Sequence, residues 1–258
     1  MDRTQREAYF ERMKLTASDT TGEEELSTLI RAHLEHIPFE NLTVYDFHQV
    51  PDLSEQALFE KIVLQKRGGY CFELNSLLLA LLREIGYDAY PIAVRIIRNR
   101  DCMPPIAHMG VVVREAGEKY YCDVGYGGPG PKGLVCLREG VQEIYGDSFR
   151  VTKADGDYRI ERLHKGEWEG ILQFEDHLFR QVDFSPLNFT SANNPDGLFT
   201  RKRVLYIYTP DGSKSLLDME FTLWKNGEVQ KTIYQNKEQL EKELLEEFGI
   251  PITLPALC

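Results

Sequence analysis

The sequence offers little from which a disulfide framework or a zinc site could be built. Its 258 residues include five cysteines, an odd number, and no two of them form a Cys-x-x-Cys pair. Secreted disulfide scaffolds need paired cysteines, and structural zinc sites need closely spaced ones. We therefore expect no metal and a reducing, cytoplasmic location in which a thiol stays free to react. The five are Cys71, Cys102, Cys122, Cys136 and Cys258.

Long apolar runs and an excess of positive charge are also missing from the sequence. No run approaches the roughly 20 apolar residues that a membrane-spanning helix needs. The charged start, MDRTQREAYFERMKL, has no apolar core of the kind found in signal peptides. The 30 Lys and Arg against 41 Asp and Glu leave a formal net charge of -11. Because nucleic acids are bound by clustered basic charge, we expect neither a nucleic-acid nor a membrane partner, whereas a small phosphorylated ligand in a local basic pocket is compatible.

What the sequence does contain is a change of pattern near Tyr87. Before it, apolar residues recur at helical spacing, and Gly86 is placed to stop the last of these helices. After it come short β-rich runs separated by Gly, Asp and Pro, and finally a charged amphipathic helix. We predict an α+β fold with helices first, then a β section, then a mixed end. The predicted helices are 2–13, 21–36, 54–65, 71–85 and 237–248, and the predicted strands are 89–98, 109–114, 119–124, 149–153, 158–163, 204–209, 219–224 and 229–234.

Cys71 directly follows Gly68-Gly69-Tyr70 and stands in the first turn of a predicted helix. Free backbone N–H groups and the helix dipole stabilise negative charge there, so they favour the thiolate, which is the nucleophilic form of cysteine. The two glycines allow a tight turn and leave room beside the sulfur. Burial of a small side chain is the alternative explanation of Cys71. The turn and the helix start favour a reactive thiol.

A cysteine nucleophile needs a base, and the base needs an orienting partner. His108 precedes one predicted strand and Asp123 lies near the end of the next, so we expect an antiparallel hairpin. A turn centred on Ala116-Gly117 would place His108 opposite Gly125, with Asp123 diagonal to it on the same face. A turn centred on Glu115-Ala116 would place His108 directly opposite Asp123. Either turn brings imidazole and carboxylate to one face, whereas a bulged loop of odd length would not.

Both residues also have an ordinary structural explanation. His108 would be a polar residue near a strand start, and Asp123 would introduce the glycine-rich loop that follows it. Their pairing on one hairpin downstream of Cys71 favours the functional interpretation. The other histidines lack a partner in so simple a geometry, and we predict that they are surface or packing residues: His33, His36, His48, His164 and His177.

Several motifs resemble signatures of the arylamine N-acetyltransferase family. Residues 67–75, RGGYCFELN, are similar to its nucleophile motif. Residues 9–12, YFER, and 36–42, HIPFENL, resemble its N-terminal signatures. Residues 123–127, DVGYG, resemble its D-V-G-F-G motif, with Tyr126 at the usual Phe position. The motifs extend from residue 9 to about residue 130, and the chain length suits the whole family.

The resemblance implies a three-domain architecture. Residues 1–86 would form a helical domain that carries the nucleophile, and residues 87–188 a β-barrel-like domain that carries His108 and Asp123. Residues 189–258 would form an α/β lid. The first two domains would resemble the cysteine core of papain and the transglutaminases.

The resemblance also implies a chemistry. Acetyl-CoA would be the donor, and arylamines, arylhydrazines or arylhydroxylamines the acceptors. Cys71, His108 and Asp123 would form a catalytic triad that works by a ping-pong mechanism through an acetyl-cysteine. Arg67 and Glu40 match family positions that form an ion pair near the site, where they could tie the nucleophile turn to the first domain.

Acceptor and donor sites can be proposed only as candidates. Phe39, Phe72, Val94 and Ile106 could line a pocket for a flat ring, although for any single one of them core packing is the more ordinary explanation. The family segment S-T-H-P-x-S-x-F corresponds to ANNPDGLF at residues 192–199, which keeps only the proline and the phenylalanine. Phe199 is therefore a further candidate wall of the acceptor pocket.

The loop of residues 125–133, GYGGPGPKG, is the candidate CoA site. Backbone amides at Gly127 and Gly128 and the cation of Lys132 could hold CoA phosphates, or the loop could be a plain surface loop. Two other functions use the same residues. A triad of this kind could hydrolyse amides or thioesters, and a non-catalytic relative could keep the fold to bind ligands.

Overall fold

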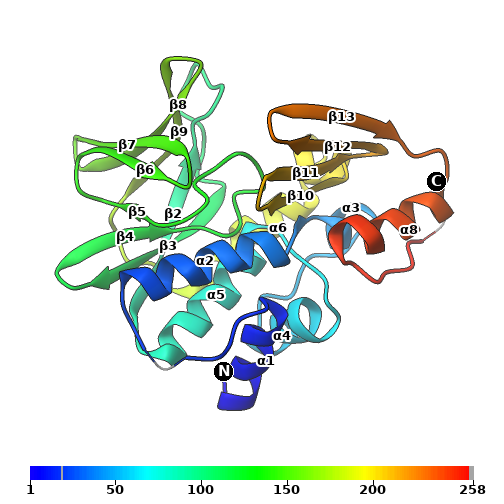
Figure 1. Cartoon of the computed structure of the whole chain (residues 1–258), viewed down its shortest axis with the longest axis horizontal. Helices are drawn as coiled ribbons and strands as arrows, with labels where there is room; N and C mark the ends of the chain where they lie inside the picture. The colour runs from blue at the N-terminus through cyan, green and yellow to red at the C-terminus, as the bar shows by residue number, and fades with distance from the viewer. Residues whose placement is uncertain (19, 256–258) are drawn as a thin grey trace.

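Helices make up most of the first third of the chain (Figure 1). The structure, a computed structural model, describes residues 1–18 and 20–255. The predicted helices 2–13, 21–36 and 71–85 are confirmed to within two residues at each end. The prediction for residues 54–65 was incomplete, because an α-helix there passes into a π-helix. The elements are α1 (Arg3–Arg12), α2 (Glu23–His36), β1 (Phe39–Glu40), α3 (Leu42–Tyr45), α4 (Glu55–Phe59), the π-helix η1 (Glu60–Leu64) and α5 (Cys71–Ile85).

Helix α5 is buried on nearly every side. It contacts α4 on one side and strands β2 (Asp88–Ile96) and β3 (His108–Glu115) on the other. It ends at Gly86 in the left-handed conformation, with a φ of 113°, as its sequence predicts. The helix that begins with Cys71 is therefore fixed between two layers of the molecule. Its fully buried leucines are Leu74, Leu77, Leu78, Leu81 and Leu82.

An eight-stranded antiparallel sheet follows and curls into a nearly closed, barrel-like shape. Side chains of β3 alternate between its two faces: Met109 and Val111 pack with the helices, whereas Val112 packs inside the barrel. The strand order is β5-β4-β3-β2-β9-β8-β7-β6. The other strands are β4 (Glu118–Cys122), β5 (Val135–Cys136), β6 (Gly140–Ile144), β7 (Asp147–Ala154), β8 (Asp157–His164) and β9 (Glu167–Glu175).

A second antiparallel sheet, in the order β1-β10-β11-β12-β13, is covered by helix α8 (Lys237–Phe248) (Figure 1). Its first strand, β1, comes from the helical region, where Phe39 lies opposite Tyr206 and Glu40 opposite Leu205. The second sheet is thus joined to the segment that precedes α3. Its other strands are β10 (Val204–Thr209), β11 (Gly212–Leu217), β12 (Glu220–Lys225) and β13 (Glu228–Ile233).

Residues 181–201, between the two sheets, are mostly helical. They form the 3-10 helix η2 (Gln181–Phe184), α6 (Ser185–Asn193) and α7 (Leu198–Arg201). Pro186 lies in the first turn of α6, where a missing N–H costs nothing. The α+β prediction is confirmed. No helix in the described part of the chain is long and apolar enough to cross a membrane, and Cys258 lies outside the described residues.

Candidate active site

The turn before Cys71 is pressed tightly against its neighbours. A Cβ atom on Gly68 would lie 1.9 Å from the carbonyl oxygen of Pro38, and one on Gly69 would lie 2.8 Å from the Cβ of Glu73. The carbonyl of Gly69 accepts a hydrogen bond of 2.9 Å from the N–H of Glu40. Glycine is therefore required at both positions, 68 and 69, of this turn. Cys71 itself opens α5 and is only 3% exposed.

Four charged side chains form a network of ion pairs beside the same turn. Glu40, fully buried, lies 2.7 Å from Arg67 Nη2, so the ion pair implied by the sequence is present. Lys61 Nζ lies 2.6 Å from Glu73 Oε1 and 3.5 Å from Glu40 Oε1. The other carboxylate oxygen of Glu73 accepts a hydrogen bond from the backbone N–H of Tyr70. Two buried carboxylates are thus balanced by two cations, and both carboxylates contact the nucleophile turn or its neighbouring strand.

The hairpin carrying His108 and Asp123 turns at Ala116-Gly117, the first of the two turns considered above. Both turn residues have positive φ, 49° and 85°, as a two-residue hairpin turn of this type requires. Glu115 pairs with Glu118 in this register. The ring Nε2 of His108 lies 2.7 Å from Asp123 Oδ2, and both residues are buried. Imidazole and carboxylate are therefore in direct contact, as the period-two argument predicts.

The carboxylate of Asp123 receives three further hydrogen bonds. Tyr121 donates its hydroxyl to Oδ2 at 2.7 Å, while Asn75 Nδ2 and the N–H of Gly125 donate to Oδ1 at 2.9 and 2.8 Å. Burial alone would raise the pKa of Asp123, but the charge and hydrogen bond of His108, with the other donors, hold it below its usual value. Asp123 is therefore kept ionised inside the protein.

His108 lies between this carboxylate and Cys71. Burial by itself lowers the pKa of the His108 ring. The charges of Asp123 and Cys71 and hydrogen bonds to both act in the opposite direction and together outweigh burial, so the pKa is raised to about 10. The ring is therefore a cation at neutral pH and faces a thiol on one side and a carboxylate on the other. The backbone of Gly125 packs directly against Cys71, because a Cβ on Gly125 would lie only 2.6 Å from the Cα of Cys71.

The candidate acceptor residues are only partly brought together. The ring of Phe199 lies 5.9 Å from that of Phe39 and 5.5 Å from that of Tyr70, which in turn lies 5.5 Å from Phe72. Val94 belongs instead to the interior of the barrel, where it pairs with His108 across β2 and β3. These four rings thus form an aromatic cluster beside the turn that precedes Cys71.

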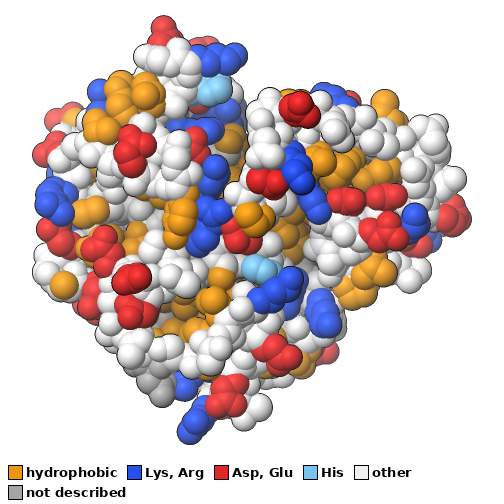
Figure 2. Space-filling model, in the orientation of Figure 1, with side chains coloured by type: hydrophobic (Ala, Val, Ile, Leu, Met, Phe, Trp, Pro, Cys, Tyr) orange, Lys and Arg blue, Asp and Glu red, His pale blue; other side chains and the backbone are white. Residues whose placement is uncertain are grey.

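Of the candidate CoA residues, Lys132 lines a cleft between the two sheets, whereas Gly127 and Gly128 line a separate and much smaller pocket. Lys132 lies 3.1 Å from Asp147 and 5.7 Å from the ring centroid of Tyr208. Gly127 lies against the ring of Phe39, and the carbonyl of Gly128 accepts from the hydroxyl of Tyr208. The cleft encloses about 400 Å³, and Figure 2 shows basic side chains gathered along it. Its lining includes Arg98, Lys132, Arg162, His164, Tyr206, Tyr208 and Trp224.

Sequence reasoning missed two residues that hold the site together. Asn75 donates to Asp123 and to the carbonyl of Met109, and its Oδ1 accepts from the N–H of Val124. It stands four residues after Cys71, on the same face of α5, so helical spacing could have identified it. Tyr121, two residues before Asp123 on the same face of the hairpin, carried the corresponding period-two signal.

Comparisons with known proteins agree with this geometry. Residues 24–257 match a family model described as N-acetyltransferase. The chain is 31% identical over 249 residues to the arylamine N-acetyltransferase / N-hydroxyarylamine O-acetyltransferase of Salmonella typhimurium, covering 95% of this chain and 88% of that protein. A solved structure of arylamine N-acetyltransferase from Salmonella typhimurium superimposes with a TM-score of 0.93 at 29% identity, over 98% of this chain and 93% of that one. Mycobacterium marinum arylamine N-acetyltransferase, solved in complex with CoA, superimposes with a TM-score of 0.87 at 26% identity, over 95% and 92%. The chain belongs to the arylamine N-acetyltransferase family.

Proposed function

We propose that this protein transfers an acetyl group from acetyl-CoA to arylamines, arylhydrazines or arylhydroxylamines, with Cys71, His108 and Asp123 as its catalytic residues. The observation that supports the proposal is the 2.7 Å contact between the buried His108 ring and the ionised carboxylate of Asp123, with Cys71 near enough to raise the pKa of the same ring. This is the arrangement that activates a cysteine nucleophile and fixes its base.

In the first half-reaction the imidazolium of His108 holds Cys71 as the thiolate. The thiolate attacks the thioester carbonyl, and N–H groups of the first turn of α5 stabilise the developing oxyanion. The C–S bond to CoA then breaks, and His108 gives its proton to the departing CoA thiolate. Cys71 is left acetylated and His108 neutral, with Asp123 keeping the ring in its orientation.

In the second half-reaction the amine attacks the acetyl-cysteine. An aromatic amine is largely unprotonated at neutral pH, so its lone pair is available without a prior deprotonation. His108 takes the proton that the nitrogen loses, the bond to Cys71 breaks, and the thiolate–imidazolium pair is restored. One covalent intermediate serves both halves, which makes the kinetics ping-pong.

The cleft between the sheets is the proposed place for the CoA nucleotide. Arg98, Lys132 and Arg162 leave the cleft with more positive than negative charge, although Asp147 of the same lining pairs with Lys132 and Arg162, and phosphates need such a local patch. Trp224 and Tyr206 offer aromatic faces to the adenine. The Mycobacterium marinum structure with CoA supports CoA as the ligand of this fold. The residues of the cleft therefore fit a nucleotide polyphosphate.

Mass spectrometry after mixing with acetyl-CoA, without acceptor, tests the proposal. We expect one acetyl group on Cys71, removed by an added arylamine with formation of the acetylated amine. A Cys71→Ser variant provides the control and should carry no adduct. Release of free acetate with no amide product would instead identify a thioester hydrolase. Absence of any adduct or turnover would favour a non-catalytic ligand-binding protein.

A further inference from the structure

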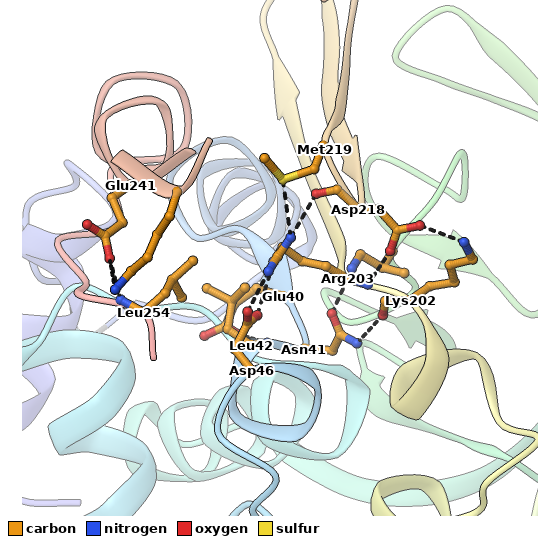
Figure 3. A network of polar contacts seen from close by, with 12 residues as sticks. Glu40, Asn41, Leu42, Asp46, Lys202, Arg203, Asp218, Met219, Glu241 and Leu254 are labelled. Atoms are coloured by element: carbon orange, nitrogen blue, oxygen red, sulfur yellow. Dashed lines mark hydrogen bonds and ion pairs between the residues drawn. The ribbon is translucent and has the colours of Figure 1, made fainter. Parts of the chain in front are cut away.

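The side chain of Asn41 bonds to three backbone groups that lie far away in the sequence. Its Nδ2 donates to the carbonyls of Phe199 and Lys202, both at 2.8 Å, and Figure 3 shows Asn41 beside Lys202. Its Oδ1 accepts from the N–H of Val204 at 2.7 Å. The residue is 1% exposed. An amide side chain has two donor hydrogens and a carbonyl oxygen, so all of these groups are engaged.

Both ends of α3 hold this distant segment. Asn41 stands at the N-cap of α3, where asparagine usually caps its own helix, yet it makes no such bond. At the other end, Asp46 accepts two hydrogen bonds from Arg203, at 3.1 Å from Nε and 2.5 Å from Nη2 (Figure 3). Arg203 and Asp46 are both buried. Polar side chains at both termini of helix α3 thus form hydrogen bonds to residues 199–204.

Helix α7 has little hydrophobic packing of its own. It is four residues long and none of its residues is fully buried. Its one aromatic side chain, Phe199, packs between Phe39 and Tyr70, and Tyr70 directly precedes Cys71. Because the bonds from Asn41 go to backbone atoms, they hold α7 whatever side chains it carries. This fits the unusual sequence of residues 192–199, which keeps little of the family pattern.

We infer that Asn41 is a positioning residue for the acceptor, which holds the backbone of α7 and thereby sets the Phe199 ring beside the nucleophile turn. The inference rests on the proposed function, because it takes acetylated Cys71 as the group that the acceptor meets. It concerns the second half-reaction only. The bonds of Asn41 end at residues 199–204, and the backbone pairing of β1 with β10 does not involve its side chain, so acetylation of Cys71 by acetyl-CoA should proceed as in the wild type.

Two variants of Asn41 separate the parts of this arrangement. Asn41→Asp keeps an acceptor for Val204 and turns an oxygen toward the two carbonyls, whereas Asn41→Ala removes all three bonds. Asn193→Asp is the matched control, because the exposed Asn193 donates to a carbonyl within α6 only. We expect KM for a single-ring arylamine to rise at least about tenfold in both Asn41 variants, because Asn41→Asp loses two buried hydrogen bonds and Asn41→Ala loses three. For a two-ring arylamine, which makes further contacts besides that with the Phe199 ring, KM should change less than about threefold.

Rapid-mixing mass spectrometry should give a rate of Cys71 acetylation within about twofold of wild type in every variant. Hydrogen exchange of the backbone N–H of Val204 gives a readout that does not depend on catalysis, and it should quicken in Asn41→Ala. An unchanged exchange rate of the Val204 N–H in Asn41→Ala would overturn the inference. Faster exchange combined with arylamine KM values equal to those of Asn193→Asp would also overturn it. So would a rate of Cys71 acetylation that falls as much as the rate of acetyl transfer to the amine. Failure of the wild type to form the adduct would contradict the proposed function itself, before any variant is compared.

Discussion

Asn75 and Asp123 are joined by a hydrogen bond of 2.9 Å that ties helix α5, which begins with Cys71, to the hairpin that carries His108. The same amide also contacts Met109 and Val124 of that hairpin. The relative position of Cys71 and the imidazole is therefore set by a residue that takes no part in the chemistry.

Replacement of Asn75 by alanine should loosen this connection. Asp123 loses one of its donors and Met109 loses a partner, so the pKa of Asp123 should rise and the base should be less well oriented. We expect kcat/KM to fall at least about tenfold, with the acid limb of its pH profile moved to higher pH. Asn193→Ala serves as the control, and equal pH profiles in the two variants would contradict the assignment.

Loss of any catalytic residue should remove nearly all activity. Cys71→Ser, His108→Gln and Asp123→Ala should each lower kcat at least about a thousandfold, because residues of a triad act as a unit. Circular dichroism should show that Cys71→Ser leaves the fold intact. Cys102→Ser, at an exposed cysteine, should keep full activity. Turnover like that of the wild type in any of the three variants would refute the triad.

Alkylation by iodoacetamide tests the charge state of the pair. Although Cys71 is almost closed to solvent, the proposed role as nucleophile predicts that it reacts faster than the exposed Cys102 near neutral pH, because a neighbouring imidazolium makes a cysteine more nucleophilic. The pKa of His108 is raised to about 10, so the ring keeps its charge below that pH and loses it above. The rate advantage should therefore be largest near neutral pH, because ordinary thiols ionise unaided above about pH 8.5, and it should vanish in His108→Gln. Equal rates at the two cysteines would end the argument for an activated thiol.

Lys61 should matter to stability far more than a surface lysine. Its removal in Lys61→Met leaves the buried carboxylates of Glu40 and Glu73 with one cation fewer, which costs about 3–5 kcal/mol by analogy with other buried pairs. Lys231→Met, which breaks an exposed pair with Glu220, should cost less than about 1 kcal/mol. Adding Glu73→Gln to Lys61→Met should recover part of the loss. Urea unfolding of the wild type and of these three variants measures the free energy of unfolding. Equal losses of stability in Lys61→Met and Lys231→Met would contradict the charge balance described above.

His33 should make the protein sensitive to acid. It is fully buried, and neither ring nitrogen has a hydrogen-bond partner in the described part of the chain. Burial, with a smaller effect of the charge on Arg12, lowers its pKa to about 3. The unfolded chain binds this proton below about pH 6.5, so the free energy of unfolding should fall as the pH drops from there toward 3.

A His33→Leu variant should flatten that decline and raise stability at pH 5, measured by thermal unfolding across the pH range. His48→Asn, at an exposed histidine, should leave the pH dependence as it is in the wild type. A steep decline that survives in His33→Leu would assign the acid sensitivity to another group. The sequence interpretation of His33 as a packing residue agrees with its burial, but sequence gave no sign that its nitrogens would lack partners.

Local signals predicted the parts of the site that depend on neighbours in the chain. The periodicity of residues 71–85 and the glycine after them defined α5, because helical burial repeats over a few residues. Strand alternation brought His108 and Asp123 to one face, because the hairpin spans few residues. The choice between two turns was open, since both Ala116-Gly117 and Glu115-Ala116 are compatible with the pattern.

The rest depends on contacts between distant segments, which local patterns do not encode. The pairing of β1 with β10 joins residues more than 160 positions apart, and only two residues of β1 take part. Val94 was a candidate for the acceptor pocket because it is apolar, yet its place inside the barrel follows from the curl of the whole sheet. The division into domains at residues 86 and 188 stays a prediction.

The strand β1 also has a consequence for when the enzyme can become active during synthesis. Phe39 bridges to Gly69 on one side and pairs with Tyr206 on the other, so the backbone beside Cys71 gains its full support only once β10 has docked. Pairings over such long separations form late and slowly. A chain still emerging from the ribosome would carry the sulfur, the imidazole and the carboxylate long before it carries β10. Nascent chains, and chains truncated before β10, should therefore be inert.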